Sequence, residues 1–357
     1  MLMQPTIFFT TPVEDDQVAR IAAASKGRAS VIYEPDLLPP IRYVADHKGH
    51  ADFRLTPKQK ERWKARLAEA NFLWDLPPLD SLPPLDSRPM SGMAWAPNLR
   101  WVQTTSSGVG PTIKNFGLAQ SEVIVSTAKG VHAEPLSEFV LLAILMHVKR
   151  LRHLRSEQAA HRWQRYCGEA LAGKTVVIVG AGEVGHRVAQ VCKFMGMRVL
   201  AMSRRLTLSE GHARGYDGIF TRAQMAEVLS QADAVVLSVP HTPETERMFD
   251  AEMIAAMTPD AILVNIARGQ VVDETALINA LKDNRIGFAA LDVAQTEPLP
   301  ADSPLWDLPN VLISPHSAST VADENKKITD IFIHNLDCLL DDRPNDMTNV
   351  FDKSQLL

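Results

Sequence analysis

The fold of this chain is decided by residues 175–185, which read Thr-Val-Val-Ile-Val-Gly-Ala-Gly-Glu-Val-Gly. The first five residues, 175–179, are β-branched and apolar, which predicts a buried strand. This strand runs directly into a GxGxxG spacing, and residues 183–194 have the pattern of a helix. A strand that ends in these glycines and leads into a helix is the sequence signature of a dinucleotide-binding βαβ unit.

Each glycine of this motif has its own physical role. Gly180 allows the tight turn, Gly182 lets the backbone approach a pyrophosphate, and Gly185 lets the helix pack closely on the strand. The pyrophosphate would lie at the helix N-terminus, beside Glu183 and Val184, where N–H groups and the helix dipole favour anions.

The end of the next predicted strand, Arg198–Met202, indicates which dinucleotide is bound. NAD sites usually carry an acidic residue there for the ribose 2′-hydroxyl. Here the sequence continues Ser203, Arg204, Arg205, and two guanidinium groups beside a hydroxyl suit a 2′-phosphate. We therefore expect NADP(H) rather than NAD(H). The alternative is that the two arginines lie on a solvated loop.

Strand and helix patterns alternate along most of the chain, which predicts an α/β fold with parallel sheets. Further buried strands are expected at 234–239, 261–266, 287–291 and 311–314. The N-terminal region predicts a second, smaller α/β unit with strands at 7–9, 30–33, 72–75, 100–104 and 123–125. One long helix is expected over 136–164, and because its middle is apolar on every face we expect it to be buried in a homodimer interface.

The composition excludes several classes of protein. The chain has 357 residues, enough for two to three domains, and its net charge of −5 argues against nucleic acid as a partner. The longest apolar run, 139–146, is short of the roughly 20 residues of a membrane span. Three widely spaced cysteines and an N-terminus without signal-peptide features fit a cytoplasmic protein. No cluster of metal ligands is evident.

Three later segments each place a polar residue just after a predicted strand. Arg268 follows the strand at 261–266, Asp292 and Glu297 follow the strand at 287–291, and His316 follows the strand at 311–314. Ligands of open α/β sheets bind outside the carboxyl ends of the strands. We therefore expect a cation, a carboxylate and an imidazole to converge near one edge of the nicotinamide site.

Together with the glycine motif, these segments resemble the D-isomer-specific 2-hydroxyacid dehydrogenase family over roughly residues 100–320, including its glyoxylate/hydroxypyruvate reductases. The resemblance implies that His316 is the general acid/base and that Glu297 is its acid partner. It implies that Arg268 grips the substrate carboxylate and polarises the carbonyl, and that Asp292 binds the nicotinamide carboxamide.

The resemblance also implies contacts outside this constellation. The loop after the strand at 100–103 resembles the family loop whose backbone amides receive the substrate carboxylate, here at Ser107 and Gly108. Remaining cofactor contacts are expected from Val239, Pro240, Thr245, Ile266 and Ala267.

The expected architecture is a Rossmann domain inserted into a smaller flavodoxin-like domain. The NADP-binding domain would span 129–319, and the substrate-binding domain would comprise 1–128 and 320–357. The sequence leaves open whether Trp163, His132, Arg42 or Tyr43 line the site, and what the proline-rich segment 36–97 does.

The expected function is hydride transfer between NADP(H) and a small 2-keto or D-2-hydroxy acid. Two alternatives remain at this point. One is a dehydrogenase of a bulkier or phosphorylated 2-hydroxy acid, and the other is a nucleotide-sensing protein of the corepressor type.

Overall fold

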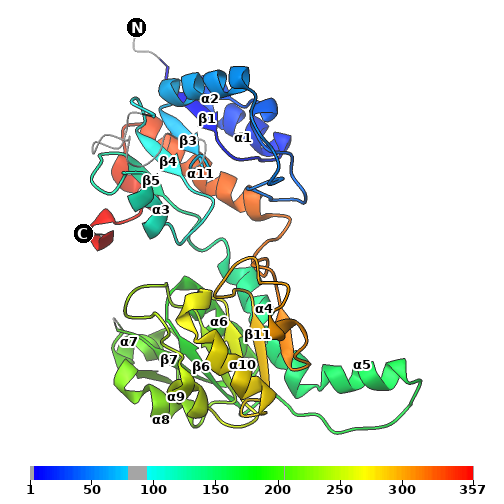
Figure 1. The fold of residues 1–357 in the computed structure, drawn as a ribbon. Helices are drawn as coiled ribbons and strands as arrows, with labels where there is room; N and C mark the ends of the chain where they lie inside the picture. The colour runs from blue at the N-terminus through cyan, green and yellow to red at the C-terminus, as the bar shows by residue number, and fades with distance from the viewer. Residues whose placement is uncertain (1–3, 79–94, 205, 357) are drawn as a thin grey trace. The chain divides into compact units, whose positions relative to one another are not determined.

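The computed structural model describes residues 4–78, 95–204 and 206–356, which form two compact units (Figure 1). The first unit comprises Met1–Val131 and Thr320–Leu357, and the second comprises His132–Ser319. Each unit is built on a parallel β-sheet with helices between the strands, which confirms the α/β prediction. None of the helices in these ranges is long and apolar enough to cross a membrane.

The second unit contains a seven-stranded parallel sheet in the order β12-β11-β10-β9-β6-β7-β8. Its strands are β6 (Thr175–Val179), β7 (Arg198–Met202), β8 (Gly218–Phe220), β9 (Ala234–Leu237), β10 (Ile262–Asn265), β11 (Phe288–Leu291) and β12 (Val311–Ile313). Its helices are α4 (Ala133–Val148), α5 (Leu151–Ala159), α6 (Glu183–Phe194), α7 (Leu208–Ala213), α8 (Met225–Leu229), α9 (Ala251–Ala255) and α10 (Glu274–Lys282).

The strands of this sheet are mostly apolar, as expected for a sheet that is covered on both faces. Val176 and Ile178 of β6 lie in a core with α4 and α6, whereas Val177 and Val179 lie in the opposite core with α8, α9 and α10. All five residues of β6 are buried. Because the seven strands are parallel, their carboxyl ends lie at one edge of the sheet, and the loops of the candidate site project from this edge.

The first unit contains a five-stranded parallel sheet in the order β2-β1-β3-β4-β5. The strands are β1 (Thr6–Phe9), β2 (Ser30–Ile32), β3 (Phe72–Trp74), β4 (Trp101–Gln103) and β5 (Ile124–Ser126). The helices are α1 (Asp15–Ser25), α2 (Pro57–Glu69), α3 (Gly110–Asn115) and α11 (Glu324–Leu340). This strand order is the flavodoxin-like one.

The C-terminal helix α11 belongs to the first unit because its apolar face completes that unit's core. Ile328, Phe332 and Leu336 are buried with residues of β1, β3 and β4. The ring of Phe332 lies 4.5 Å, centroid to centroid, from that of Trp101.

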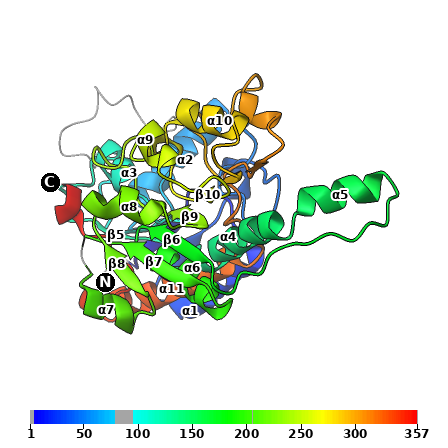
Figure 2. The same ribbon diagram turned by 90° about the horizontal axis from the view of Figure 1, so that it is seen from below.

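The prediction of one long helix over 136–164 is wrong. α4 ends at Val148, Arg150 adopts a left-handed conformation with φ of 51°, and α5 covers only Leu151–Ala159. The apolar run that favours a buried helix stops at residue 146, and the residues after it are mostly polar or charged. Consistently, α5 has no buried residue and extends away from the sheet of its own unit (Figures 1 and 2). Even α4 is not buried all round, since Leu142 is 51% exposed.

The other differences are smaller. The strand β8 was not expected, since its three residues carry little periodicity. Most other predicted strands are one or two residues shorter in the structure, and the predicted helix 183–194 is confirmed. Within the proline-rich segment, residues 79–94 lie outside the described residues.

Candidate active site

The glycine motif has the geometry that a dinucleotide requires. Gly180 has φ of +113°, a conformation that favours glycine, and a Cβ on Gly185 would lie 2.0 Å from the Gly180 carbonyl oxygen. A Cβ on Gly182, by contrast, would meet no described atom within 4 Å. Gly182 is the N-cap of α6, so the open space lies at the helix N-terminus, beside Glu183 and Val184. The motif therefore fits a bound pyrophosphate.

The loop after β7 carries the charges expected for the 2′-phosphate. Arg204 is 75% exposed at its side chain and forms a 2.9 Å ion pair with Glu244. Arg222, just after β8, donates a hydrogen bond to the backbone carbonyl of Glu244. Sequence reasoning missed both residues. Arg222 follows β8, which was not predicted, and Glu244 lies on the loop after β9, 40 positions from Arg204 in the sequence. Arg205 lies outside the described residues.

Ser203 follows β7 directly and lies in a fixed turn. Its backbone N–H donates to the Phe220 carbonyl, and its hydroxyl accepts from the Leu206 amide at 3.0 Å. The turn therefore holds Arg204 at the carboxyl edge of the sheet.

Arg268, Glu297 and His316 follow three neighbouring strands of one sheet. Asn265 of β10 pairs in register with Leu291 of β11, and Leu291 pairs with Ile313 of β12. Because these strands are parallel, the loops after them lie at the same edge. All three predicted catalytic residues thus belong to the second unit and to adjacent loops.

The histidine and the glutamate are paired directly. His316 Nδ1 lies 2.8 Å from Glu297 Oε2, and both side chains are partly exposed. The other oxygen of Glu297 accepts from the Ala294 amide at 3.2 Å, which fixes the carboxylate. Because the carboxylate accepts a hydrogen from Nδ1, the Nε2 atom of His316 is left to face a ligand.

Asp292 shapes the loop that carries His316. It is buried, and its Oδ1 accepts hydrogen bonds from the Ser314 hydroxyl at 2.7 Å and from the amides of Ser317 and Ala318 at 2.9 and 2.8 Å. Its carbonyl accepts from the His316 amide at 2.8 Å. Asp292 therefore has a structural role that the sequence did not indicate, and its contact with a carboxamide stays a prediction.

Close backbone packing fixes the turn that carries Arg268. A Cβ on Gly269 would lie 1.9 Å from the Ala294 carbonyl oxygen, so this turn and the loop after β11 approach each other closely. The Asn265 side chain accepts from the Ala267 amide at 3.0 Å and donates to the Arg268 carbonyl at 3.2 Å.

The remaining predicted cofactor residues lie on loops at the carboxyl edge of the same sheet. Val239, Ile266 and Ala267 are buried in the cores of the unit. The Thr245 hydroxyl donates to the Pro240 carbonyl at 2.7 Å and accepts from the Thr242 amide at 2.8 Å. Thr245 therefore closes the turn after β9, and a phosphate contact from it stays a prediction.

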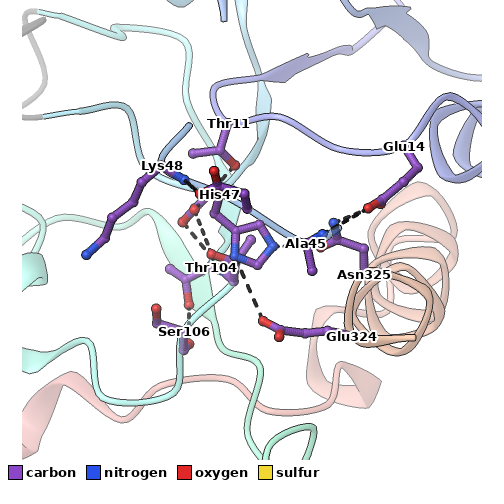
Figure 3. A network of polar contacts seen from close by, with 12 residues as sticks. Thr11, Glu14, Ala45, His47, Lys48, Thr104, Ser106, Glu324 and Asn325 are labelled. Atoms are coloured by element: carbon purple, nitrogen blue, oxygen red, sulfur yellow. Dashed lines mark hydrogen bonds and ion pairs between the residues drawn. The ribbon is translucent and has the colours of Figure 1, made fainter. Parts of the chain in front are cut away.

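The predicted carboxylate loop belongs to the first unit. Ser107 and Gly108 are exposed after β4, at the carboxyl edge of that sheet. The Thr104 hydroxyl donates to the Ser106 carbonyl at 2.8 Å, which shapes the start of the loop (Figure 3).

The residues that the sequence left open lie in different settings. Arg42 forms a two-armed ion pair with Asp46 at 2.7 and 2.9 Å, and its guanidinium stacks over Tyr43. His132 is the N-cap of α4, and Trp163 is fully exposed after α5. Among the described residues, no group of three or more His, Cys, Asp or Glu side chains is placed to hold a metal ion.

Comparison with known proteins places these features in one family. Residues 141–318 match the family described as D-isomer specific 2-hydroxyacid dehydrogenase, NAD binding domain. Glyoxylate/hydroxypyruvate reductase B of Pectobacterium atrosepticum is 35% identical over 248 residues, 68% of this chain and 76% of that protein. The chain belongs to the D-isomer-specific 2-hydroxyacid dehydrogenase family. It is therefore an oxidoreductase with a nicotinamide-dinucleotide domain, in a family that acts on small hydroxy or keto acids.

Two solved structures of 2-hydroxyacid dehydrogenases match the whole length of this chain. One, from Aeromonas salmonicida, has a TM-score of 0.77 and 26% identity, and the match covers 98% of this chain and 100% of that one. The other, from Xanthobacter autotrophicus, is a complex with NADPH and MES, with a TM-score of 0.74 and 25% identity over 99% and 100% of the chains. The (S)-sulfolactate dehydrogenase of Chromohalobacter salexigens is 32% identical over 68% of this chain and 78% of that protein.

Proposed function

We propose that this dehydrogenase reduces a small 2-keto acid, of the glyoxylate or hydroxypyruvate type, to the D-2-hydroxy acid with NADPH. The observation that carries the proposal is that the His316–Glu297 pair and Arg268 lie on the loops after three adjacent strands. The similarity to glyoxylate/hydroxypyruvate reductases supports the substrate class.

NADPH, when bound at the glycine motif, supplies a hydride for C2 of the keto acid. His316 donates a proton from Nε2 to the keto oxygen, while its Nδ1 hydrogen bond to Glu297 stabilises the imidazolium and fixes the ring. Arg268 binds the substrate carboxylate and polarises the carbonyl through its planar guanidinium. After the alcohol has formed, His316 regains a proton from solvent.

Two further roles belong to this proposal. The backbone amides of Ser107 and Gly108 receive the substrate carboxylate, as the family resemblance implies. Asp292 hydrogen-bonds the nicotinamide carboxamide while its Oδ1 holds the loop of His316.

The preference for NADPH rests on the loop after β7. Ser203 and Arg204 stand where an NAD enzyme usually carries an acid, and Arg205 follows in the sequence. Arg222 adds a third cation near the Glu244 backbone. The NADPH complex of the Xanthobacter relative supports the same assignment.

A substrate with a second acidic group is the main alternative within the enzyme class. The similarity to a sulfolactate dehydrogenase favours it. A nucleotide-sensing role would not need an acid/base pair, so the paired His316 and Glu297 argue against it.

We also propose that the enzyme is a homodimer that uses α4 and the α5 arm. The α5 arm consists of α5 and the segment after it up to residue 170. No residue of α5 is buried, and Leu154, Trp163 and Tyr166 of the arm are exposed. Large apolar side chains on an extended segment indicate a surface that a second copy covers.

A panel of 2-keto acids tests the proposed function. Glyoxylate, hydroxypyruvate, 3-phosphohydroxypyruvate, sulfopyruvate and phenylpyruvate would each be mixed with enzyme and NADPH while absorbance loss is followed. Turnover that is fastest with glyoxylate or hydroxypyruvate supports the proposal, and the His316→Ala variant serves as the background. Faster turnover of 3-phosphohydroxypyruvate or sulfopyruvate would favour a substrate with a second acidic group. No turnover of any of these acids would favour a nucleotide-sensing role.

A further inference from the structure

Asp75 occupies an unusual position at the carboxyl end of β3 in the first unit. Its backbone has φ of 64°, a left-handed conformation that non-glycine residues rarely adopt and that Asp and Asn tolerate best. In the order β2-β1-β3-β4-β5, β1 and β3 form the topological switch point of the sheet. Ligands of such sheets bind outside the strand ends at this point.

The Asp75 carboxylate joins the loops that follow β1, β3 and β4. Oδ2 accepts from the Thr105 hydroxyl at 2.7 Å and from the Thr11 hydroxyl at 3.4 Å. Oδ1 accepts from the Leu76 amide at 2.8 Å and, more weakly, from the Thr105 amide at 3.4 Å. The shortest link to another strand's loop is therefore the one to Thr105.

Thr105 begins the segment in which we place the substrate-carboxylate donors. On one side, the Thr104 hydroxyl donates to the Ser106 carbonyl at 2.8 Å (Figure 3). The same hydroxyl lies 3.2 Å from the Ser126 carbonyl. On the other side, the Ala128 amide donates to the Ser106 carbonyl at 3.2 Å. Asp75 supplies the contact that holds Thr105 itself, directly before Ser106, Ser107 and Gly108.

We propose that Asp75 is a positioning residue that holds the Thr105–Gly108 loop in the conformation that receives the substrate carboxylate. It acts through Thr105 and does not touch the substrate, because two carboxylates in contact would repel each other. The inference rests on the proposed function for its kinetic consequence. The positioning itself concerns the loop alone and is testable without turnover.

Hydrogen–deuterium exchange on the full-length enzyme tests the positioning. Asp75→Asn keeps the shape and suits the left-handed backbone, and Thr105→Val removes the hydroxyl donor at nearly constant size. Both should speed amide exchange at residues 104–109 at least about threefold, whereas Thr105→Ser should match wild type. The control is Asp233→Asn, which makes the same change of charge at a comparable anchor, since Asp233 accepts from the Thr175 amide at 2.7 Å in the second unit. It should leave exchange at 104–109 unchanged.

Steady-state kinetics with glyoxylate test the consequence. Asp75→Asn and Thr105→Val should raise KM for glyoxylate about 5- to 20-fold, with kcat and KM for NADPH within about twofold of wild type. Thr105→Ser, which keeps the hydroxyl, should have the wild-type KM for glyoxylate.

Unchanged exchange at 104–109 in both variants would overturn the inference. So would faster exchange with an unchanged KM in an enzyme that reduces glyoxylate. If wild type reduces no 2-keto acid, the proposed function fails, and the exchange data alone still decide whether Asp75 holds the loop.

Discussion

His316 Nδ1 and Glu297 Oε2 lie 2.8 Å apart, on loops that follow two paired strands of the second unit. His316 itself has φ of 55°, and its amide donates to the Asp292 carbonyl. The imidazole is therefore oriented from two sides, by its backbone and by the carboxylate. This arrangement leaves Nε2 available for the proton donation that we propose.

Replacing either of the proposed catalytic side chains, His316 or Arg268, should strongly reduce turnover. His316→Ala and Arg268→Ala should each lower kcat/KM at least about 100-fold, the lower end of what a positioned general acid contributes. Glu297→Gln keeps a hydrogen-bond acceptor but loses the charge, so we expect a smaller loss, about 10-fold. Steady-state assays with NADPH and the best substrate provide the measurement. Losses below about 10-fold in both alanine variants would contradict the mechanism.

The glycines of the motif should separate cofactor binding from stability. In Gly182→Val the new side chain enters space that no described atom fills. The Tm of the apoenzyme should therefore stay unchanged, while Kd for NADPH should rise at least about 10-fold. In Gly185→Ala the Cβ would clash with the Gly180 carbonyl, which should cost about 1–3 kcal/mol of stability. Thermal denaturation and fluorescence titration give the two readouts. Equal effects of both variants on Tm would contradict this division.

The charges after β7 should set the choice between NADPH and NADH. Arg204→Ala, alone or with Ser203→Asp, should lower kcat/KM for NADPH relative to NADH at least about 10-fold. Glu244→Gln should have the opposite effect and raise kcat/KM for NADPH about two- to fivefold, because it frees Arg204 from an exposed ion pair. Wild-type enzyme that uses NADH as well as NADPH would show that the assignment is wrong.

The exposed apolar surface of α4 should be needed for self-association. Leu142→Glu on α4 should convert the dimer to a monomer in sedimentation-velocity experiments. Leu208→Glu on α7 is the matched control, since Leu208 has a similar exposure of 54% against 51% for Leu142. A monomeric wild-type enzyme, or the same behaviour of both variants, would contradict the proposed interface.

Asp46 should make the first unit sensitive to acid. Burial by itself would raise the pKa of the Asp46 carboxyl, but hydrogen bonds from Arg42 and from the Gly49 amide hold that pKa well below its usual range. A lowered folded-state pKa stabilises the fold at pH values above the unfolded-state pKa of about 4. This stabilisation disappears as the pH falls toward the folded-state pKa.

The Asp46→Asn variant measures this contribution. The loss of unfolding free energy, relative to wild type, should be larger at pH 7 than at pH 3, as followed by urea denaturation. The exposed Asp52→Asn, nearby in the same segment, should show no such dependence. A loss that is equal at both pH values would mean that the Asp46 charge does not contribute.

Much of the second unit could be predicted from residues next to each other in the sequence. The run 175–185 contains both the strand and the glycines, so local sterics determine the turn and the start of α6. The sequence also predicted that Arg268, Glu297 and His316 lie at one edge of the sheet, because each follows a strand and parallel strands share one carboxyl edge. The end of α4 at Val148 could not be predicted, because an exposed arm carries little hydrophobic periodicity.

By itself the sequence determined the fold class, the family and the residue types of the site, since these depend on local patterns and on short motifs. Only the tertiary structure decided which side chains meet across loops. Glu244 beside Arg204, the three donors on Asp292 Oδ1 and the link from Asp75 to Thr105 join residues 20 to 40 positions apart. Such pairs depend on strand order and register, which no local pattern encodes.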